Sequence, residues 1–552
     1  MRRIPLLLGL LMAFSCAQAQ TIGLFQNDSL AFNGYTLFAP SSHTETYLID
    51  NCGQVVNQWQ SEYNPGLAVY LLENGDLLRT ARIPSGFSAG GTGGRIEQYS
   101  WEGNLQWFYE YSTETLHHHH DVEPLPNGNV LILAWEQKTR EEAIAAGRDP
   151  DRLDLDGIWL EHIVELRPVG AGPAEIVWEW NAWDHLIQDY DPERDHFGIV
   201  RDHPERIDFN FRNDFGGEDW LHANSIAYNA ELDQIAISIR NWDEFWIIDH
   251  STSTEEAAAS TGGRWGKGGD LLYRWGNPFT YDRGTMEDRR LFGQHSVYWI
   301  EADRPDGGKL MVFNNGRSRP EGDFSTVEII APPVDAEGRY LLAPGESYGP
   351  EAPDWSYGDS ESERFFSARI SGAQRLPNGN TLICSGTNGR FFEVGPDRQQ
   401  VWEYINPVRQ GGPIPQGYPI AGNAAFRVTR YPADYPAFED RDLTPGAPIE
   451  LNPLDYDCTI YASNPSTVTN EVAAWTGLRL FPNPTRGQLW VEWDEAVELS
   501  LRIFDGTGRE YHAERMGASP RFIATDTWPP GLYCLELRAA DGRRSVQKII
   551  VH

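Results

Sequence analysis

One pattern recurs along most of this chain. A hydrophobic strand is followed by a tight turn, a second hydrophobic strand and, further on, a strand that carries a tryptophan. Three of the turns contain an Asn-Gly pair, at residues 72–76, 125–129 and 376–380. Asn-Gly between strand-like runs predicts a β-hairpin, because both residues tolerate the positive φ angles of a type I′ turn. The repeat therefore predicts an all-β fold.

The tryptophan-bearing strands follow the hairpins at regular intervals and contain Trp59, Trp107, Trp178, Trp275 and Trp402. Together with hairpins around residues 222–240 and 294–317, they define about six units of four strands, and such repeats are typical of a β-propeller. We therefore predict a six-bladed β-propeller over residues 30–440. A tandem of β-sandwiches is the alternative, but it does not explain the regular tryptophans.

The composition changes after this region. Residues 441–476 are rich in Pro, Asn and Thr without a sustained period, which predicts a linker or an edge segment. Residues 477–552 contain short alternating strands separated by turns, which predicts a small C-terminal β-sandwich. With 552 residues, of which 40% are hydrophobic, the chain is long enough for both domains.

The first 19 residues have the features of an export signal. Two arginines precede an apolar run, and Ala17-Gln18-Ala19 is a small-x-small cleavage site. Cys16 raises the alternative of a lipoprotein, but Phe14 and Ser15 make a poor lipobox. No other stretch is long and apolar enough for a membrane helix, so we expect no transmembrane segment in the mature protein.

An exported protein can keep disulfides between its cysteines, because disulfides persist outside the cytoplasm. Cys52 and Cys458 flank the central region. We hypothesise that a bridge between Cys52 and Cys458 holds the two ends of this region together.

The charge of the chain limits its partners. The formal net charge is −35 at pH 7, and such a surface would repel a polyanion, so we expect no nucleic-acid partner. We interpret most of the acidic side chains as solvated surface. An acidic insert at residues 181–219 is expected to shape the entrance of a pocket.

Three histidines occupy comparable places in the hairpin repeat. His120 lies eight residues before Gly128, and His222 and His295 each begin the first strand of a further hairpin. First strands of propeller blades face the common axis, so these three side chains are expected to converge. His117–His119, the other members of a run of four histidines, are predicted to be loop residues without an assigned role.

Hairpin register predicts what lies opposite two of these histidines, because residues equally far from a turn face each other. Arg240 should lie opposite His222, and Arg317 roughly opposite His295 if that hairpin turns near Asp306. Guanidinium groups suit an anion and keep their charge. A zinc or copper site is the competing interpretation of the imidazoles, although the arginines argue against a cation.

The chain resembles the bacterial arylsulfotransferase family over residues 30–410. The likeness rests on HDVEPLPNGNVLIL, DWLHANSIAYN, GQHSV, MVFNNG and SGAQRLPNGNTLICSGTNGRFFEV, in that order. Members of this family are six-bladed propellers that move a sulfuryl group from a phenolic sulfate ester to a phenol. They use no nucleotide donor, so the resemblance implies no cofactor and no metal, with an aryl sulfate donor and a phenolic acceptor as partners.

The resemblance also implies roles for single residues. His295 corresponds to the histidine that becomes transiently sulfurylated, and His120 to a further pocket histidine. The residues that correspond to those holding the sulfuryl oxygens are His222, Asn224 and Arg240. Arg317 is a candidate substrate-binding residue on its predicted register.

Residues 477–552 resemble the C-terminal sorting domain of the type IX secretion system, through FPNPTRG, GLY before Cys534 and the terminal QKIIVH. This resemblance implies a cleavable address that the type IX machinery reads, and a protein that is secreted or displayed on the cell surface.

A second class of function stays open beside catalysis. A non-catalytic surface propeller would bind an anionic glycan or a protein partner through the same basic axis. The two functions differ at His295, because only an enzyme loses turnover when its nucleophile is removed.

Overall fold

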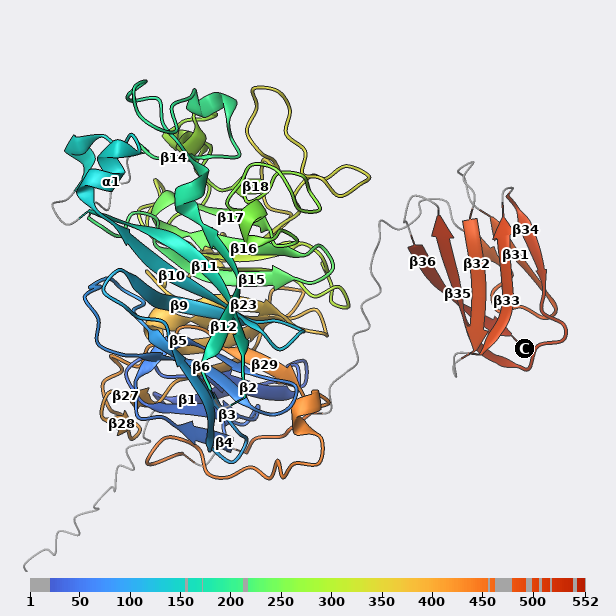
Figure 1. Ribbon diagram of the computed structural model, residues 1–552. Helices are drawn as coiled ribbons and strands as arrows, with labels where there is room; N and C mark the ends of the chain where they lie inside the picture. Colours follow the sequence, from blue (N-terminus) through green and yellow to red (C-terminus); the bar gives the residue numbers. More distant parts are fainter. Residues whose placement is uncertain are drawn as a thin grey trace, which may run out of the picture. The chain divides into compact units, whose positions relative to one another are not determined.

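The computed structural model describes residues 20–153, 157–170, 172–211, 217–454, 457–461, 479–492, 499–505, 509–516, 519–539 and 544–551. The predicted export signal lies outside these residues. The chain divides into two compact units, Met1–Asn464 and Pro465–His552. Both units are built mainly of β-strands (Figure 1). No helix in the described part of the chain is long and apolar enough to cross a bilayer.

The described part of the first unit contains six larger antiparallel sheets, whose members mostly follow one another along the chain. The first sheet comprises β29 (Thr429–Pro432), β2 (Gly34–Phe38), β3 (Glu45–Ile49) and β4 (Val55–Gln60). The second comprises β5 (Pro65–Leu71), β6 (Leu77–Arg82), β7 (Gly94–Tyr99) and β8 (Leu105–Glu110). The third comprises β9 (Leu116–Pro124), β10 (Val130–Lys138), β11 (Ile158–Pro168) and β12 (Ala174–Asn181).

The remaining three sheets continue the same order. The fourth comprises β15 (Ala223–Asn229), β16 (Gln234–Ile239), β17 (Glu244–Asp249) and β18 (Tyr273–Trp275). The fifth comprises β19 (His295–Trp299), β20 (Leu310–Asn314), β21 (Thr326–Ile330) and β22 (Trp355–Tyr357). The sixth comprises β23 (Gly372–Arg375), β24 (Thr381–Ser385), β25 (Arg390–Val394), β26 (Gln400–Ile405) and β1 (Gly23–Asn27).

Short elements connect these sheets. The strand pairs β13 (Leu186–Ile187) with β14 (Ile207–Asp208) and β27 (Val408–Arg409) with β28 (Gly412–Pro413) form two small sheets. Helix α1 (Arg140–Ala145) follows β10, and α2 (Thr254–Ala257) follows β17. The predicted acidic insert packs against the segment after α1, because the Asn210 amide donates to the Gly147 carbonyl oxygen at 2.8 Å.

The first strands of successive sheets lie against one another, which gives the unit a shared interior. Strand β5 contacts β9, β9 contacts β15, β15 contacts β19, and β19 contacts β23. Residues at the start of these strands, far apart in sequence, are therefore brought into one region. His120 lies within β9, His295 begins β19, and His222 directly precedes β15.

The regular tryptophans have a structural reason. All five are buried, and each indole N–H donates to a loop of the following sheet. The acceptors are Ser100 O for Trp59, Gly172 O for Trp107, Thr252 Oγ1 for Trp178, Pro350 O for Trp275 and Asn51 O for Trp402. Trp402 lies in the sixth sheet, and its indole N–H donates to a loop of the first sheet. The repeated residue thus fastens each of these sheets to its neighbour.

The two ends of the first unit are also fastened together. Strand β1 pairs with β26 of the last sheet, and β29 pairs with β2 of the first. Cys52 and Cys458 form a disulfide with a Cα–Cα distance of 5.8 Å. The Gly446 amide donates to the Val55 carbonyl oxygen at 2.8 Å. Residues 441–454 and 457–461 therefore belong to the first unit.

The three predicted Asn-Gly hairpins are present, but their turns are not type I′. In each, the glycine amide donates to a leucine carbonyl three residues earlier, as from Gly75 to Leu72 at 2.9 Å. Only the glycine has a positive φ, 88° at Gly75, 85° at Gly128 and 87° at Gly379. This is a type I turn followed by a left-handed glycine, the usual three-residue hairpin loop.

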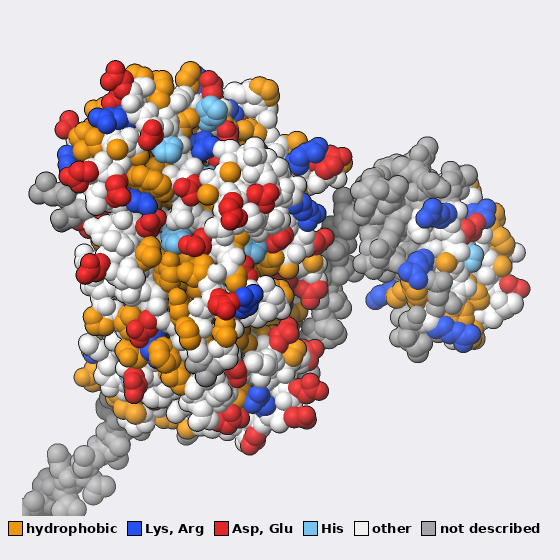
Figure 2. Space-filling view, in the orientation of Figure 1, with side chains coloured by type: hydrophobic (Ala, Val, Ile, Leu, Met, Phe, Trp, Pro, Cys, Tyr) orange, Lys and Arg blue, Asp and Glu red, His pale blue; other side chains and the backbone are white. Residues whose placement is uncertain are grey.

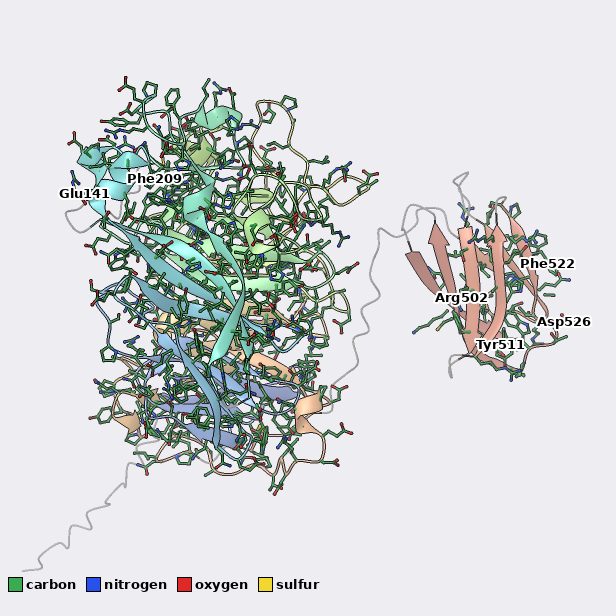
Figure 3. All side chains as sticks on the ribbon, in the orientation of Figure 1. Glu141, Phe209, Arg502, Tyr511, Phe522 and Asp526 are labelled. Atoms are coloured by element: carbon green, nitrogen blue, oxygen red, sulfur yellow. A yellow bond between two sulfur atoms is a disulfide. The ribbon has the colours of Figure 1, made fainter. Side chains whose placement is uncertain are left out.

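The second unit has two sheets with one apolar core. One sheet holds β30 (Arg479–Phe481), β31 (Gln488–Glu492) and β34 (Arg521–Ala524), and the other holds β33 (Glu510–Met516), β32 (Leu499–Asp505), β35 (Gly531–Ala539) and β36 (Arg544–Val551). Residues of both sheets, including Leu489 and Leu535, are buried in the same cluster. Tyr511, labelled in Figure 3, packs on Tyr533 with ring centroids 5.0 Å apart.

The acidic balance of the chain is visible on the surface. Asp and Glu side chains are scattered over the face shown in Figure 2, with Lys and Arg among them. This distribution supports the interpretation of the acidic residues as a solvated surface.

Candidate active site

The run of four histidines lies within β9, and all four side chains are buried. The prediction that His117–His119 are loop residues is therefore wrong. The ring of His117 stacks on Phe87 with centroids 5.6 Å apart, and the ring of His119 stacks on Trp135 at 4.0 Å. These aromatic contacts compensate for the burial of side chains that ordinarily prefer the surface.

A kink in the backbone sets the direction of His120. Its φ is 51°, in the left-handed region that residues with a Cβ rarely adopt. Neighbouring side chains normally point to opposite faces of a strand. The kink breaks this alternation, so the rings of His119 and His120 meet with centroids 5.2 Å apart. Positive φ angles also occur early in the other first strands, or just before them, at Leu67, His222, Ser296 and Ser371.

The three predicted histidines come together. The rings of His120 and His222 are 4.7 Å apart between centroids and nearly perpendicular. Burial holds the pKa of His120 well below its usual value, and the nearby His222, His119, His295 and Arg240 lower it further. His120, His222 and His295 therefore share one site with Arg240.

The tautomer of His295 is determined by Asn315 together with the Gly293 carbonyl oxygen, which lies 3.1 Å from the same Nδ1. The Asn315 amide nitrogen donates to the carbonyl oxygens of Ser367 at 2.7 Å and Ile370 at 2.9 Å, so its Oδ1 faces His295. Because Oδ1 can only accept, the Nδ1 of His295, 2.7 Å away, carries the proton. The Nε2 atom is then unprotonated and accepts a hydrogen bond from the Ile370 amide at 3.1 Å.

The protonation state of His295 follows from its surroundings. Burial lowers its pKa to about 3, and Arg240 contributes to the decrease, while the hydrogen bond that His295 donates to Asn315 opposes it. His295 is therefore neutral near pH 7. A neutral imidazole with an unprotonated Nε2 is a competent nucleophile once the Ile370 amide releases that nitrogen.

His222 and Arg240 are held by residues around the end of the acidic insert. The Asp219 carboxylate is hydrogen-bonded to Nδ1 of His222. Asn241 links Asp219 to Arg240. Its amide donates to the Asp219 carbonyl oxygen at 2.9 Å, and its Oδ1 accepts from Arg240 at 2.8 Å. The last residue of the insert thus positions a site histidine.

The predicted pairing of Arg240 with His222 is confirmed. Ala223 pairs with Ile239 across β15 and β16, and the Arg240 amide donates to the His222 carbonyl oxygen at 3.3 Å. The turn is centred between Glu231 and Leu232, and a β-bulge between Ala223 and Ser225 brings Arg240 opposite His222.

The predicted pairing of Arg317 with His295 is wrong. His295 pairs with Phe313, because the hairpin is centred before Asp306 and a β-bulge shifts the register between His295 and Tyr298. Arg317 follows the end of β20 and is exposed. It still lies near the site, since it is one of the charges that lower the pKa of Arg240.

Asn224 presents an open acceptor in this region. Its amide nitrogen donates to the Gln294 carbonyl oxygen at 2.8 Å. Its Oδ1 is buried and has no hydrogen-bond partner among the described residues. Buried polar atoms are nearly always paired, so this oxygen marks a place where a bound molecule can donate a hydrogen bond.

Several residues of the site were not predicted from the sequence. Asn315 is one, although it lies in the MVFNNG stretch that carries the family resemblance. Asp219 is another, and its position three residues before His222 was the available signal. Glu161 and Arg369 had none, because their proximity to the site arises from tertiary contacts.

Residues 24–409 match the arylsulfotransferase (ASST) family, and residues 479–552 match the C-terminal sorting domain of a secretion system. The first match covers more than half of the chain, so this protein belongs to the arylsulfotransferase family. A curated relative, the arylsulfate sulfotransferase AssT of Escherichia coli O6:H1, is 27% identical over 193 residues. This alignment covers 32% of the chain but only 29% of the relative.

Solved structures similar to this chain include two proteins at 10% identity. The periplasmic gluconolactonase PpgL of Pseudomonas aeruginosa has a TM-score of 0.36, with 72% of this chain and 99% of that chain covered. The β-propeller domain of Cps50 (Swd1) from Myceliophteria thermophila has a TM-score of 0.32, with 71% and 89% covered. No functional inference is drawn from likenesses this low.

Proposed function

We propose that this protein is an aryl sulfotransferase that moves a sulfuryl group from a phenolic sulfate ester to a phenol through a sulfohistidine at His295. The observation that carries the proposal is the Asn315 hydrogen bond, which leaves a lone pair on Nε2 of a neutral histidine beside Arg240. Membership of the arylsulfotransferase family supports the substrate class.

In the first half-reaction, Nε2 of His295 attacks sulfur and the bond from sulfur to the phenolic oxygen breaks. Sulfuryl transfer resembles phosphoryl transfer, so its transition state is loose and carries charge on the peripheral oxygens. Arg240 supplies a fixed positive charge for these oxygens. We assign His222 to the same oxygens, with Arg317 at the edge of the site for the incoming donor. Asn224 is assigned to the acceptor phenol, whose hydroxyl can donate to the open Oδ1.

His120 is assigned to proton transfer. It is neutral, because burial and the surrounding cationic groups lower its pKa. It lies against His222 and is positioned to protonate the departing phenolate and later to deprotonate the acceptor. In the second half-reaction the acceptor phenol attacks sulfur, and Nε2 of His295 is released.

The architecture that we propose for this function is a six-bladed propeller. Each larger sheet of the first unit would be one blade, and the contacts between first strands support a common axis. The match of residues 479–552 supports a sorting domain that directs the protein through the type IX system to the cell surface or the medium. An export signal at residues 1–19 would precede this step.

The test of the proposed function uses an aryl sulfate that releases a chromophore. We expect release to depend on added phenol and the acceptor to become sulfated, as measured by absorbance and mass spectrometry. Release without sulfation of any phenol would indicate a sulfatase. No release from folded protein, together with saturable binding of the aryl sulfate, would favour the non-catalytic binding function.

The loop between β6 and β7 offers a sharper prediction. The Gly91 carbonyl oxygen accepts from the His120 amide at 2.7 Å, and a Cβ at Gly91, whose φ is +83°, would lie 2.0 Å from the His120 ring. Gly91→Ala must therefore displace the ring or the loop. We expect transfer to fall on the order of 10²-fold, as small misplacements of catalytic groups do.

Gly86→Ala is the matched control, because a Cβ at this position of the same loop has no atom within 4 Å. Initial rates per folded enzyme would be compared for both variants. Equal rates for Gly91→Ala and the unmodified protein would contradict the expectation that transfer depends on this placement of the His120 ring.

A further inference from the structure

A chain of buried hydrogen bonds leads away from His120. Its Nδ1 lies 2.9 Å from Nδ1 of His119. Nε2 of His119 lies 2.9 Å from Oε2 of Glu161, and Oε1 of Glu161 accepts from the Ala223 amide at 2.7 Å. The side chains of His119 and Glu161 are 0% and 1% exposed. This chain of hydrogen bonds therefore ends at the buried carboxyl group of Glu161.

Two arrangements of protons satisfy this chain. In the first, Glu161 is a carboxylic acid that donates to Nε2 of His119, the Nδ1–H of His119 donates to His120, and His120 carries a proton on Nε2. In the second, every donor and acceptor is reversed, Glu161 is a carboxylate, and Nε2 of His120 is bare. The two arrangements differ by one proton, and in both each imidazole is neutral.

We propose that Glu161 and His119 form a proton relay that stores the proton exchanged by His120 during each cycle. The proposal rests on the proposed sulfuryl transfer and adds two positioning residues to it. Glu161 does not touch the substrate. It acts through His119 by determining which nitrogen of His120 carries hydrogen.

The relay balances the protons of the reaction. When the bond from sulfur to the phenolic oxygen breaks, this oxygen takes the proton from Nε2 of His120. Nδ1 of His120 receives the proton of His119, and Nε2 of His119 receives that of Glu161, which becomes a carboxylate. When the acceptor phenol attacks the sulfurylated His295, its proton returns along the same path. No proton is exchanged with water.

The charges around the relay support the first arrangement as the resting state. Burial raises the pKa of Glu161 to about 8; nearby Asp219 raises it and His222 lowers it. Burial lowers the pKa of His119 to about 3, with Asp219 opposing and His222 adding to the decrease. The other groups that face the chain of hydrogen bonds through His120 are His295 and Arg240. A neutral acid therefore faces a neutral imidazole near pH 7.

The population of the first arrangement, in which Glu161 is protonated, depends on pH. The proton on Glu161 is present below the pKa of about 8 and is lost as the pH rises through that value. Transfer from donors that need a protonated leaving group should fall over the same range. Donors whose phenolates leave unassisted should show a smaller decrease.

Glu161→Gln tests the relay directly. The glutamine oxygen can still accept from Ala223 and its amide can donate to His119, but the amide cannot give up a proton. With 4-nitrophenyl sulfate, whose phenolate is a stable anion, we expect initial rates of phenol release to change by less than about threefold. With phenyl sulfate, whose phenolate needs protonation, they should fall on the order of 10²-fold.

Glu165→Gln is the matched control on the same strand. Glu165 is buried in β11 and hydrogen-bonded to Nε2 of His250 at 3.0 Å, outside the site. The Glu165→Gln variant should lower the rates with both donors by the same factor or leave both rates unchanged. A Glu161→Gln variant that behaves in the same way would overturn the relay. Absence of transfer by the unmodified protein would instead refute the proposed function.

A second measurement does not depend on turnover. Nitrogen-15 NMR of histidine-labelled protein distinguishes Nδ1–H from Nε2–H tautomers. We expect His120 to be protonated on Nε2 below the pKa of Glu161 and on Nδ1 above it, with the change absent in Glu161→Gln. A His120 tautomer that does not change across this range would contradict the relay.

Discussion

His295→Asn is expected to abolish sulfuryl transfer. The rate should fall by about 10⁴-fold or more, because removal of a covalent nucleophile leaves only binding and electrostatic stabilisation. Asparagine keeps a polar side chain beside Asn315, so the fold should be retained. The measurement is the release of phenol from an aryl sulfate with and without acceptor, alongside circular dichroism.

A buried histidine outside the site provides the control for this variant. His250 is hydrogen-bonded to Asp233 and Glu165, and His250→Asn should leave the rate per folded molecule unchanged. Transfer by His295→Asn near the unmodified rate would show that the sulfuryl group passes directly from donor to acceptor, without a covalent intermediate.

The second large effect is expected at Asn315. Asn315→Ala removes the shorter of two contacts that keep the proton on Nδ1 of His295 and leaves the Gly293 carbonyl oxygen at 3.1 Å. Part of the population then carries the proton on Nε2 and cannot attack. We expect kcat to fall by about 10² to 10⁴-fold, in the range that loss of tautomer control costs in other enzymes, with little change in KM. Steady-state kinetics with an aryl sulfate would separate the two constants.

Asn314 is the control for Asn315. Its side chain accepts from the Phe292 amide at 2.9 Å and donates to the Arg290 carbonyl oxygen at 2.9 Å, without contact to His295. Asn314→Ala should lower thermal stability while kcat per folded molecule is retained. Equal losses of kcat in the two variants would mean that Asn315 acts only on stability.

The hairpin repeat could be predicted from the sequence because both of its signals have local causes. Asn-Gly turns need a glycine at a left-handed position, and the tryptophans supply an N–H group that reaches the next sheet. The turn type could not be predicted as easily, since Asn-Gly is compatible with a two-residue and a three-residue loop. The length of β9 was missed because a histidine run gives no apolar pattern.

Register predicted the candidate site only in part. Equal distances from Glu231 placed Arg240 opposite His222, and the structure agrees, because a β-bulge between Ala223 and Ser225 offsets a turn centred slightly later. The same reasoning failed for Arg317, because the hairpin is centred before Asp306 and a β-bulge in β19 shifts the pairing further. Glu161 reaches His119 from two strands away in the sheet, and no sequence spacing encodes such a contact.

The most direct test of the central claim is a search for the covalent intermediate. The unmodified protein would be mixed with an aryl sulfate without acceptor, digested, and analysed by mass spectrometry under mild conditions. The account predicts a sulfuryl adduct on the peptide that contains His295, which disappears when a phenol is added and is absent in His295→Asn. Turnover without any adduct, or an adduct on another residue, would contradict it.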